Sequence, residues 1–223
     1  MRNINVALSA LAMAALAACS SGPPVPDWKM NAQSSIERYE AAYLNGQTLV
    51  EQTEFQRARS QVGGTGKIDL VARVELLRCA TRVASLVFED CTGFDALRAE
   101  ANAADRAYAA YLAGTLQAAD IALLPEAQRG VAGAGSDTAA ADAVAAIKDP
   151  LSQLVAAGVL LRASRATPAL LDTAVATASD QGWRRPLLAW LGVQRLRAEQ
   201  AGDAQEAGRI ARRMAIVGQP PAP

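Results

Sequence analysis

The sequence of 223 residues contains no histidine, and only 4% of its residues are aromatic. Histidine is the general base of Ser-His-Asp and Cys-His catalytic centres, a usual zinc ligand and the side chain whose unperturbed pKa lies nearest to neutrality. Its absence excludes those centres and the ligation of haem through histidine. We therefore expect no catalytic residue, no metal site and no cofactor, and a protein that is not an enzyme.

The sequence also has no excess of charge of one sign. Lys plus Arg and Asp plus Glu both number 22, so the formal net charge is zero. Proteins that bind nucleic acid neutralise its phosphates with a surplus of Lys and Arg. The balance therefore argues against a nucleic-acid partner. The three cysteines include no Cys-x-x-Cys pair, which argues against a thiol oxidoreductase.

Alanine is abundant in the sequence, with 51 copies. It has the highest helix propensity and buries little area, so it favours closely packed helices over sheets. Apolar residues recur at helical spacing between Gly, Pro and capping residues, which predicts an all-α fold. The predicted helices cover 28–45, 48–62, 67–87, 92–113, 136–148, 150–164, 168–181, 186–201 and 204–217, with shorter ones over 115–123 and 125–131. Thr48 and Glu51 have the spacing of a capping box.

The first residues have the organisation of an export signal. Arg2 gives a positive start, and Val6–Leu16 is an apolar run shorter than the roughly 20 residues that cross a bilayer. The run ends in Leu16-Ala17-Ala18-Cys19. This segment resembles the lipobox of bacterial lipoproteins, in which a signal peptidase cuts before the cysteine and the cysteine is acylated. An ordinary secretory signal, which would leave Cys19 as a thiol, is the alternative.

The lipoprotein resemblance implies how the mature protein is held. Cys19 would carry fatty acyl chains such as palmitate and act as a permanent anchor. By the sorting preference of enterobacterial lipoproteins, Ser20 implies the outer membrane, with the body at its periplasmic face. Three prolines between Pro23 and Pro26 favour an extended tether. The predicted organisation is a signal peptide at 1–18, a lipidated cysteine and tether at 19–27, a single helical domain at 28–217 and a flexible tail at 218–223.

Two further cysteines, Cys79 and Cys91, would lie in the oxidising periplasm, where an even number of thiols suggests a disulfide. One continuous helix would separate their Cα atoms by about 18 Å, whereas a disulfide needs about 4.4 to 6.8 Å. The helix must therefore stop near residues 85–88 for the bridge to form. Two buried free thiols are the alternative.

Three predicted helix pairs, at 28–62, 150–181 and 184–217, are near 34 residues long, which is the period of tetratricopeptide repeats. Residues of the first and last pairs also match parts of that family's motif; they are Gly46, Phe55, Ala58, Gly202 and Ala207. Glu51 stands where the motif has Ala, and the Trp-x-x-Leu-Gly of the first helix is missing. The body is thus similar to tetratricopeptide proteins, which implies antiparallel helix pairs stacked as an α-solenoid. An irregular helical bundle is the alternative.

The last helix pair has a local excess of Arg beside tryptophan, two residue types enriched at interface hot spots. The predicted partner surface consists of Trp183, Arg184, Arg185, Arg195, Arg209, Arg212 and Arg213. A core tryptophan with arginines on the outer face of a terminal helix pair is the simpler alternative.

Helical repeats present extended binding surfaces. The predicted function is that of a lipid-anchored periplasmic scaffold or adaptor, which binds an unidentified envelope protein during envelope or secretion-complex assembly. One alternative is a peptidoglycan-acting enzyme that uses carboxylates, another a structural lipoprotein that binds peptidoglycan. Candidate carboxylates are Glu51, Glu54, Glu89 and Asp90, although the sequence places each where a solvated charge is expected.

Overall fold

The computed structural model describes residues 24–219, and the predicted signal peptide, Cys19 and the last four residues lie outside this range. The described chain forms eleven α-helices and one 3-10 helix, with no strand. They are α2 (Asp27–Leu44), α3 (Thr48–Gly63), α4 (Ile68–Ala84), α5 (Thr92–Asp95), α6 (Ala103–Ala113), η2 (Ala118–Leu123), α7 (Glu126–Ala132), α8 (Asp137–Ala146), α9 (Pro150–Arg162), α10 (Pro168–Asp180), α11 (Arg184–Gln200) and α12 (Ala204–Gly218). The predicted all-α class is confirmed.

Short polar side chains start many of these helices. The side-chain oxygens of Asn102, Ser136, Asp149, Thr167 and Asp203 each accept a hydrogen bond from a backbone N–H in the first turn of the following helix. Each bond satisfies a donor that the helix itself leaves unpaired, which contributes about 1 kcal/mol. The predicted starts of α9, α10 and α12 at residues 150, 168 and 204 are therefore confirmed.

Two predicted local features are wrong. No capping box forms at Thr48, because Thr48 is already inside α3 and Gln47 precedes the helix without a side-chain cap. The segment 92–113 is not one helix: α5 ends at Asp95, turns and a bend follow, and α6 begins after Asn102. The Asn102 cap gives the chain a new helix start there, which outweighs the continuous helical pattern.

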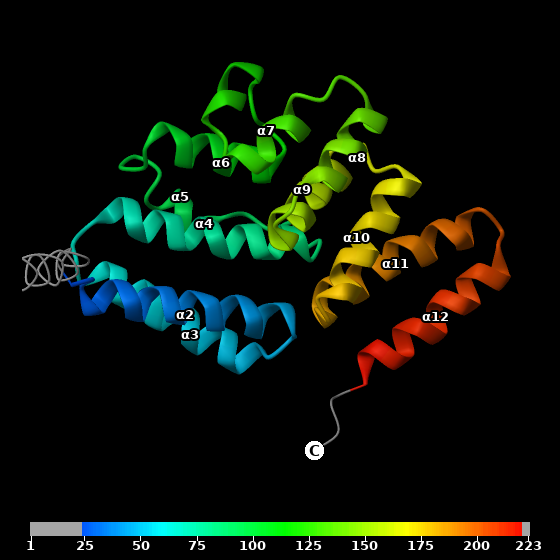
Figure 1. Ribbon diagram of the computed structural model, residues 1–223, viewed down its shortest axis with the longest axis horizontal. Helices are drawn as coiled ribbons and strands as arrows, with labels where there is room; N and C mark the ends of the chain where they lie inside the picture. The colour runs from blue at the N-terminus through cyan, green and yellow to red at the C-terminus, as the bar shows by residue number, and fades with distance from the viewer. Residues whose placement is uncertain (1–23, 220–223) are drawn as a thin grey trace, which may run out of the picture.

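The helices pack as hairpins around a central helix (Figure 1). α2 and α3 form one hairpin, α11 and α12 form another, and α9 packs against α10. Helix α4 lies between the first hairpin and the rest of the molecule, and it packs against α9 although more than 60 residues separate them along the chain. The three predicted pairs at 28–62, 150–181 and 184–217 are thus present as packed helices. The contact between α4 and α9, however, connects helices that are not neighbours in the sequence.

The C-terminal end of α4 packs closely against α9 and α11. A Cβ atom added to Gly158 on α9 would overlap the carbonyl oxygen of Val83 on α4, so only glycine allows this approach. The indole of Trp190 on α11 is fully buried beside it, and its Nε1–H donates to the carbonyl oxygen of Ala84 over 3.1 Å. This bond satisfies a carbonyl that the end of α4 leaves unpaired.

A disulfide joins Cys79 in α4 to Cys91 in the following loop, with the two Cα atoms 5.9 Å apart. The helix ends at Ala84, just before the predicted stop, and Leu86 adopts a left-handed conformation with φ 61° that turns the chain back. The bridge ties the loop before α5 to the central helix. In the chain-entropy model a loop of this size contributes roughly 3 kcal/mol.

Within residues 24–219, every helix is too short or too polar to cross a lipid bilayer.

The α4–α9 contact predicts opposite effects for two glycine-to-alanine substitutions. Alanine has a helix propensity about 1 kcal/mol better than glycine, and at the open position Gly208 of α12 this gain should stabilise the protein by roughly 0.5 to 1 kcal/mol. At Gly158 the overlap with Val83 should instead destabilise it by about 1 to 3 kcal/mol. Urea unfolding followed by circular dichroism measures both changes, and a Gly158→Ala protein as stable as Gly208→Ala would contradict the packing described here.

Candidate functional site

A groove runs along the flank of α2 that faces α4. It consists of two adjoining cavities, one of about 580 Å³ and one of about 220 Å³, which share Leu77 of α4. Ile36 of α2 lies in the smaller cavity, and Glu40, one turn further along the helix, lies in the larger. We call the two together the α2–α4 groove. Its length follows α2, so it suits an elongated ligand better than a compact one.

The smaller cavity is apolar. Trp28 and Ile36 of α2 line one side, and Leu70 and Val74 of α4 line the other. Val74 is a buried member of the core cluster that α2, α3 and α4 share, and Trp28, Ile36 and Leu70 pack partly buried against it. A ligand that covers this edge would gain the free energy of burying apolar surface, about 25 cal/mol per Å².

The larger cavity has an apolar floor and an acidic rim. Leu44 of α2, Ala80 of α4 and Val155 of α9 are buried beneath it. Glu37 and Glu40 come from α2, and Asp149 comes from the residue before α9. Among the described residues, none of the three carboxylates has an ion-pair partner, and no Lys or Arg lines this cavity.

The carboxyl of Glu40 is perturbed by this environment. Partial burial, followed by the charges of Asp149 and Glu37, raises its pKa from 4.5 to about 7. Tyr108 of α6 lies in the same cavity, and burial raises the pKa of its phenol as well, so that it stays neutral. The rim therefore carries the carboxyl groups of Glu37 and Asp149, and beside them Glu40, whose charge changes near neutral pH.

Trp183 lies at the end of the groove that contains the acidic cavity. It lies in the turn between α10 and α11, lines the larger cavity beside Gln181 and packs partly buried against both core clusters. Of the predicted partner surface, it is the residue that the structure places at the groove.

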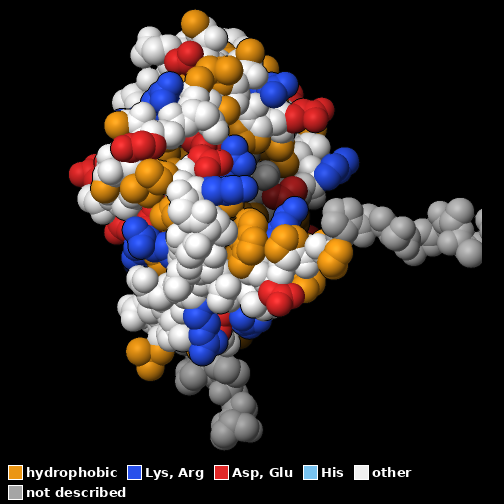
Figure 2. All heavy atoms as spheres, turned by 90° about the vertical axis from the view of Figure 1, so that its left-hand side faces the viewer, with side chains coloured by type: hydrophobic (Ala, Val, Ile, Leu, Met, Phe, Trp, Pro, Cys, Tyr) orange, Lys and Arg blue, Asp and Glu red, His pale blue; other side chains and the backbone are white. Residues whose placement is uncertain are grey.

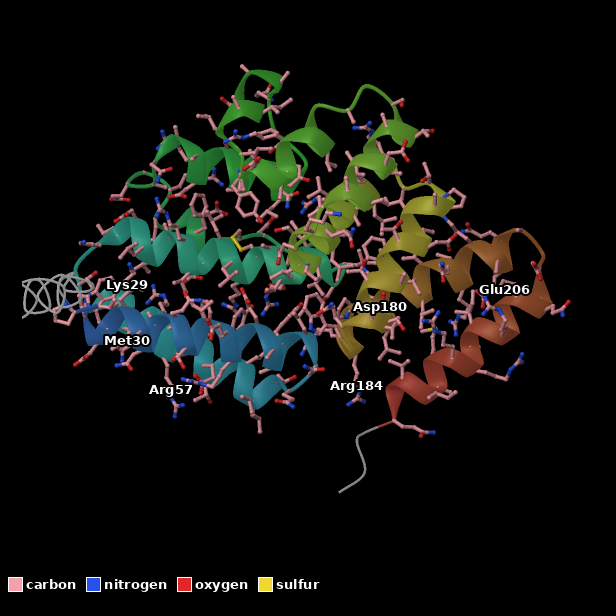
Figure 3. All side chains as sticks on the ribbon, in the orientation of Figure 1. Lys29, Met30, Arg57, Asp180, Arg184 and Glu206 are labelled. Atoms are coloured by element: carbon pink, nitrogen blue, oxygen red, sulfur yellow. A yellow bond between two sulfur atoms is a disulfide. The ribbon has the colours of Figure 1, made fainter. Side chains whose placement is uncertain are left out.

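The neighbouring arginines are occupied inside the fold. Arg184 donates from Nε to the carbonyl oxygen of Val217 over 3.1 Å and so caps the end of α12. Figure 3 labels Arg184 near this end of the last helix. Arg185 donates to Glu51 over 3.0 Å and lies above the ring of Tyr43, with its guanidinium carbon 4.2 Å from the ring centroid. Both arginines therefore join α11 to other helices.

The remaining four arginines of the predicted surface lie along α11 and α12, away from the groove. Arg195 pairs with Glu199 and Arg209 pairs with Glu206, each within its own helix. Arg213 donates to the hydroxyl of Ser179, and Arg212 is exposed. The seven predicted residues are thus spread over three settings: the groove edge, helix-to-helix contacts and the outer face of the last hairpin. Whether any of them contacts a partner stays a prediction.

The carboxylates named from the sequence are not all solvated charges, and for two of them that expectation is wrong. Glu51 and Glu54 are each only 5% exposed, and Arg185 and Arg38 respectively neutralise them. Their burial depends on cation partners on other helices, which no local pattern reveals. Glu89 is exposed and pairs with Arg82 over 2.6 Å. Asp90 is exposed beside the disulfide.

The acidic residues of the groove were missed by the sequence analysis. Glu37 and Glu40 are three residues apart on one helix, and they flank Tyr39, which points into the core. This spacing places both carboxylates beside the apolar stripe, and it was the one signal available. Asp149 directly precedes the helix predicted from residue 150, and no sequence pattern links it to Glu37 and Glu40.

Comparisons with known proteins do not assign a family: no family model matches the chain, and neither a curated protein nor a solved structure is significantly similar to it.

Because the pKa of Glu40 is raised, ionisation of this carboxyl should lower the stability of the folded protein. Glu40→Gln should remove this pH-dependent loss of stability. The protonated form is favoured in the folded state, so the wild type loses stability relative to Glu40→Gln as pH rises from about 4.5 to about 7. Above pH 7 the variant should be more stable by about 1 to 3 kcal/mol, and below pH 4 the two should agree. Urea unfolding at a series of pH values measures the difference. A difference that does not change with pH would show that Glu40 titrates normally.

Proposed function

We propose that the protein is a lipid-anchored adaptor at the periplasmic face of the outer membrane, and that its α2–α4 groove binds a segment of another envelope protein. The anchor part of the proposal is supported by the lipobox-like segment that ends at Cys19. The adaptor part is supported by a body of packed helix hairpins. That these hairpins are tetratricopeptide-like repeats is itself part of the proposal.

The groove is the observation that carries the adaptor proposal. One end offers apolar side chains such as Trp28 and Val74, and the other offers the carboxylates of Glu37, Glu40 and Asp149. A segment with apolar residues at one end and Lys or Arg at the other would complement both ends. Because no arginine or lysine of the chain's described part lies in the acidic cavity, these carboxylates are available to a partner.

A photo-reactive amino acid at Ala41 tests where a partner binds. Ala41 lines the acidic cavity and is exposed, whereas Gln56, the control position, is exposed on α3 outside the groove. In intact cells the Ala41 probe should join a partner that the Gln56 probe does not, and mass spectrometry identifies the protein and the joined segment. A segment without Lys or Arg, or equal products from both probes, would contradict the proposal.

Binding of the purified partner should then depend on the groove carboxylates. Glu37→Gln combined with Glu40→Gln should weaken binding by roughly tenfold at low salt, because each rim charge contributes on the order of 0.5 to 1 kcal/mol. Glu100→Gln combined with Glu126→Gln removes two exposed charges outside the groove and should leave the affinity unchanged. Calorimetric titration at pH 8, where Glu40 is mainly ionised, measures both.

The perturbed carboxyl of Glu40 also favours a second candidate, a carboxylate enzyme that cleaves peptidoglycan. Glycosidases use a carboxyl of raised pKa as general acid beside a second carboxyl, and Glu40, whose pKa is raised, lines one cavity with Asp149. Incubation of the protein with purified sacculi distinguishes the candidates. Soluble fragments that vanish with Glu40→Gln favour the enzyme. Co-sedimentation without fragments favours a wall-binding lipoprotein.

A further inference from the structure

The two helices that form the groove begin at the same end of the molecule, which is also where the described chain begins. α2 starts at Asp27 and α4 starts at Ile68, and residues of both first turns surround the smaller cavity. Lys29 and Met30 are labelled at this end in Figure 3. We call this the tether end and define it by Val25, Trp28, Lys29, Met30, Lys67 and Ile68.

Apolar side chains are exposed at the tether end. Val25 is 52% exposed, Met30 is 53% exposed and Ile68 is 44% exposed, and Trp28 is partly exposed between them. Side chains of an α-helix lean toward its N-terminus, so the first turns of α2 and α4 project their side chains outward from this end. Large apolar side chains are thus exposed in and beside the first turns of both helices.

Lysine is concentrated at the same place. The chain has three lysines, and two of them, Lys29 and Lys67, lie at the tether end and are exposed. Asp27 and Asp69 are also in the first turns, where the partial positive charge of the helix N-termini offsets their charge. Figure 2 faces this side of the molecule and shows apolar, basic and acidic side chains beside the point where the described chain begins.

The length of the chain before α2 limits how far this end can stand from an anchor at Cys19. Four residues lie between Cys19 and Pro24, the first described residue, and the five steps along the chain span at most about 18 Å when fully extended. An acyl chain on Cys19 lies within the bilayer, so the tether end is held within that distance of the lipid headgroups.

We propose that the tether end rests on the phospholipid bilayer. In this arrangement Trp28 and the exposed side chains of Met30 and Ile68 enter the headgroup region, where tryptophan is enriched at membrane surfaces. Lys29 and Lys67 contact lipid phosphates. The inference relies on the Cys19 anchor of the proposed function, and it shares Trp28 with the apolar end of the groove.

If the tether end rests on the bilayer, the groove has a defined orientation relative to the membrane. Glu40 lies 12 residues after Trp28 on α2, which corresponds to about 18 Å along the helix axis. The apolar cavity would therefore open beside the membrane surface, and the acidic cavity would lie further into the periplasm. A bound segment would lie with its apolar end toward the membrane and its basic end away from it.

Tryptophan quenching by brominated lipids tests the docking. The full lipidated protein is reconstituted into phosphatidylethanolamine and phosphatidylglycerol vesicles whose acyl chains carry bromine near the headgroup, and flotation checks the anchor. Quenching should be clear for the wild type, largely lost in Trp28→Phe and retained in Trp183→Phe, since Trp183 lies at the other end of the groove and Trp190 is fully buried.

Exposed apolar residues provide the matched variants. Met30→Glu with Ile68→Glu should lose most of the quenching, whereas Leu49→Glu with Ile216→Glu, which are 80% and 71% exposed elsewhere, should retain it. Circular dichroism checks that all variants are folded. Flotation without quenching of Trp28 would overturn the docking and leave the adaptor proposal intact. Failure to float would overturn the anchor and the docking together.

Discussion

The close crossing of α4 and α9 positions the rest of the molecule. It requires a residue without a side chain at Gly158, where the backbone of Val83 fills the space that a Cβ would need. Because α4 is fixed there at its C-terminal end, α9 can supply Val155 to the floor of the acidic cavity and Asp149 to its rim. Trp190 packs against the same end of α4 and so places α11 relative to the crossing.

The N-terminal hairpin is attached to this centre by charged contacts as well as by apolar ones. Arg185 of α11 reaches Glu51 of α3 and the ring of Tyr43 of α2. Removal of one partner of such a buried pair leaves the other charge unpaired, which is strongly unfavourable. An arginine that looks from the sequence like part of a binding surface is therefore also a structural connection, and it keeps α2 in place as one wall of the groove.

Local signals predicted local structure well, and contacts between distant residues were not predictable in the same way. Asp149, Thr167 and Asp203 mark helix starts because a cap acts within four residues. The stop of α4 before the disulfide follows from the expectation of a bridge together with the Cα separation that a disulfide requires. The groove depends on α2, α4 and α9 meeting, and its carboxylates carry no motif of their own. The burial of Glu51 could not be foreseen either, since its partner Arg185 is 134 residues away.

The sequence has no imidazole, but the fold places a group with similar behaviour in the groove. Glu40 exchanges its proton near pH 7 because Asp149, Glu37 and partial burial disfavour its anion, and no other charged side chain lines that cavity within the described chain. The charge of the acidic cavity therefore differs by one unit between mildly acidic and mildly alkaline surroundings. A cationic segment bound there would be held less firmly in acid, so a glutamate supplies the response to pH that other proteins obtain from histidine.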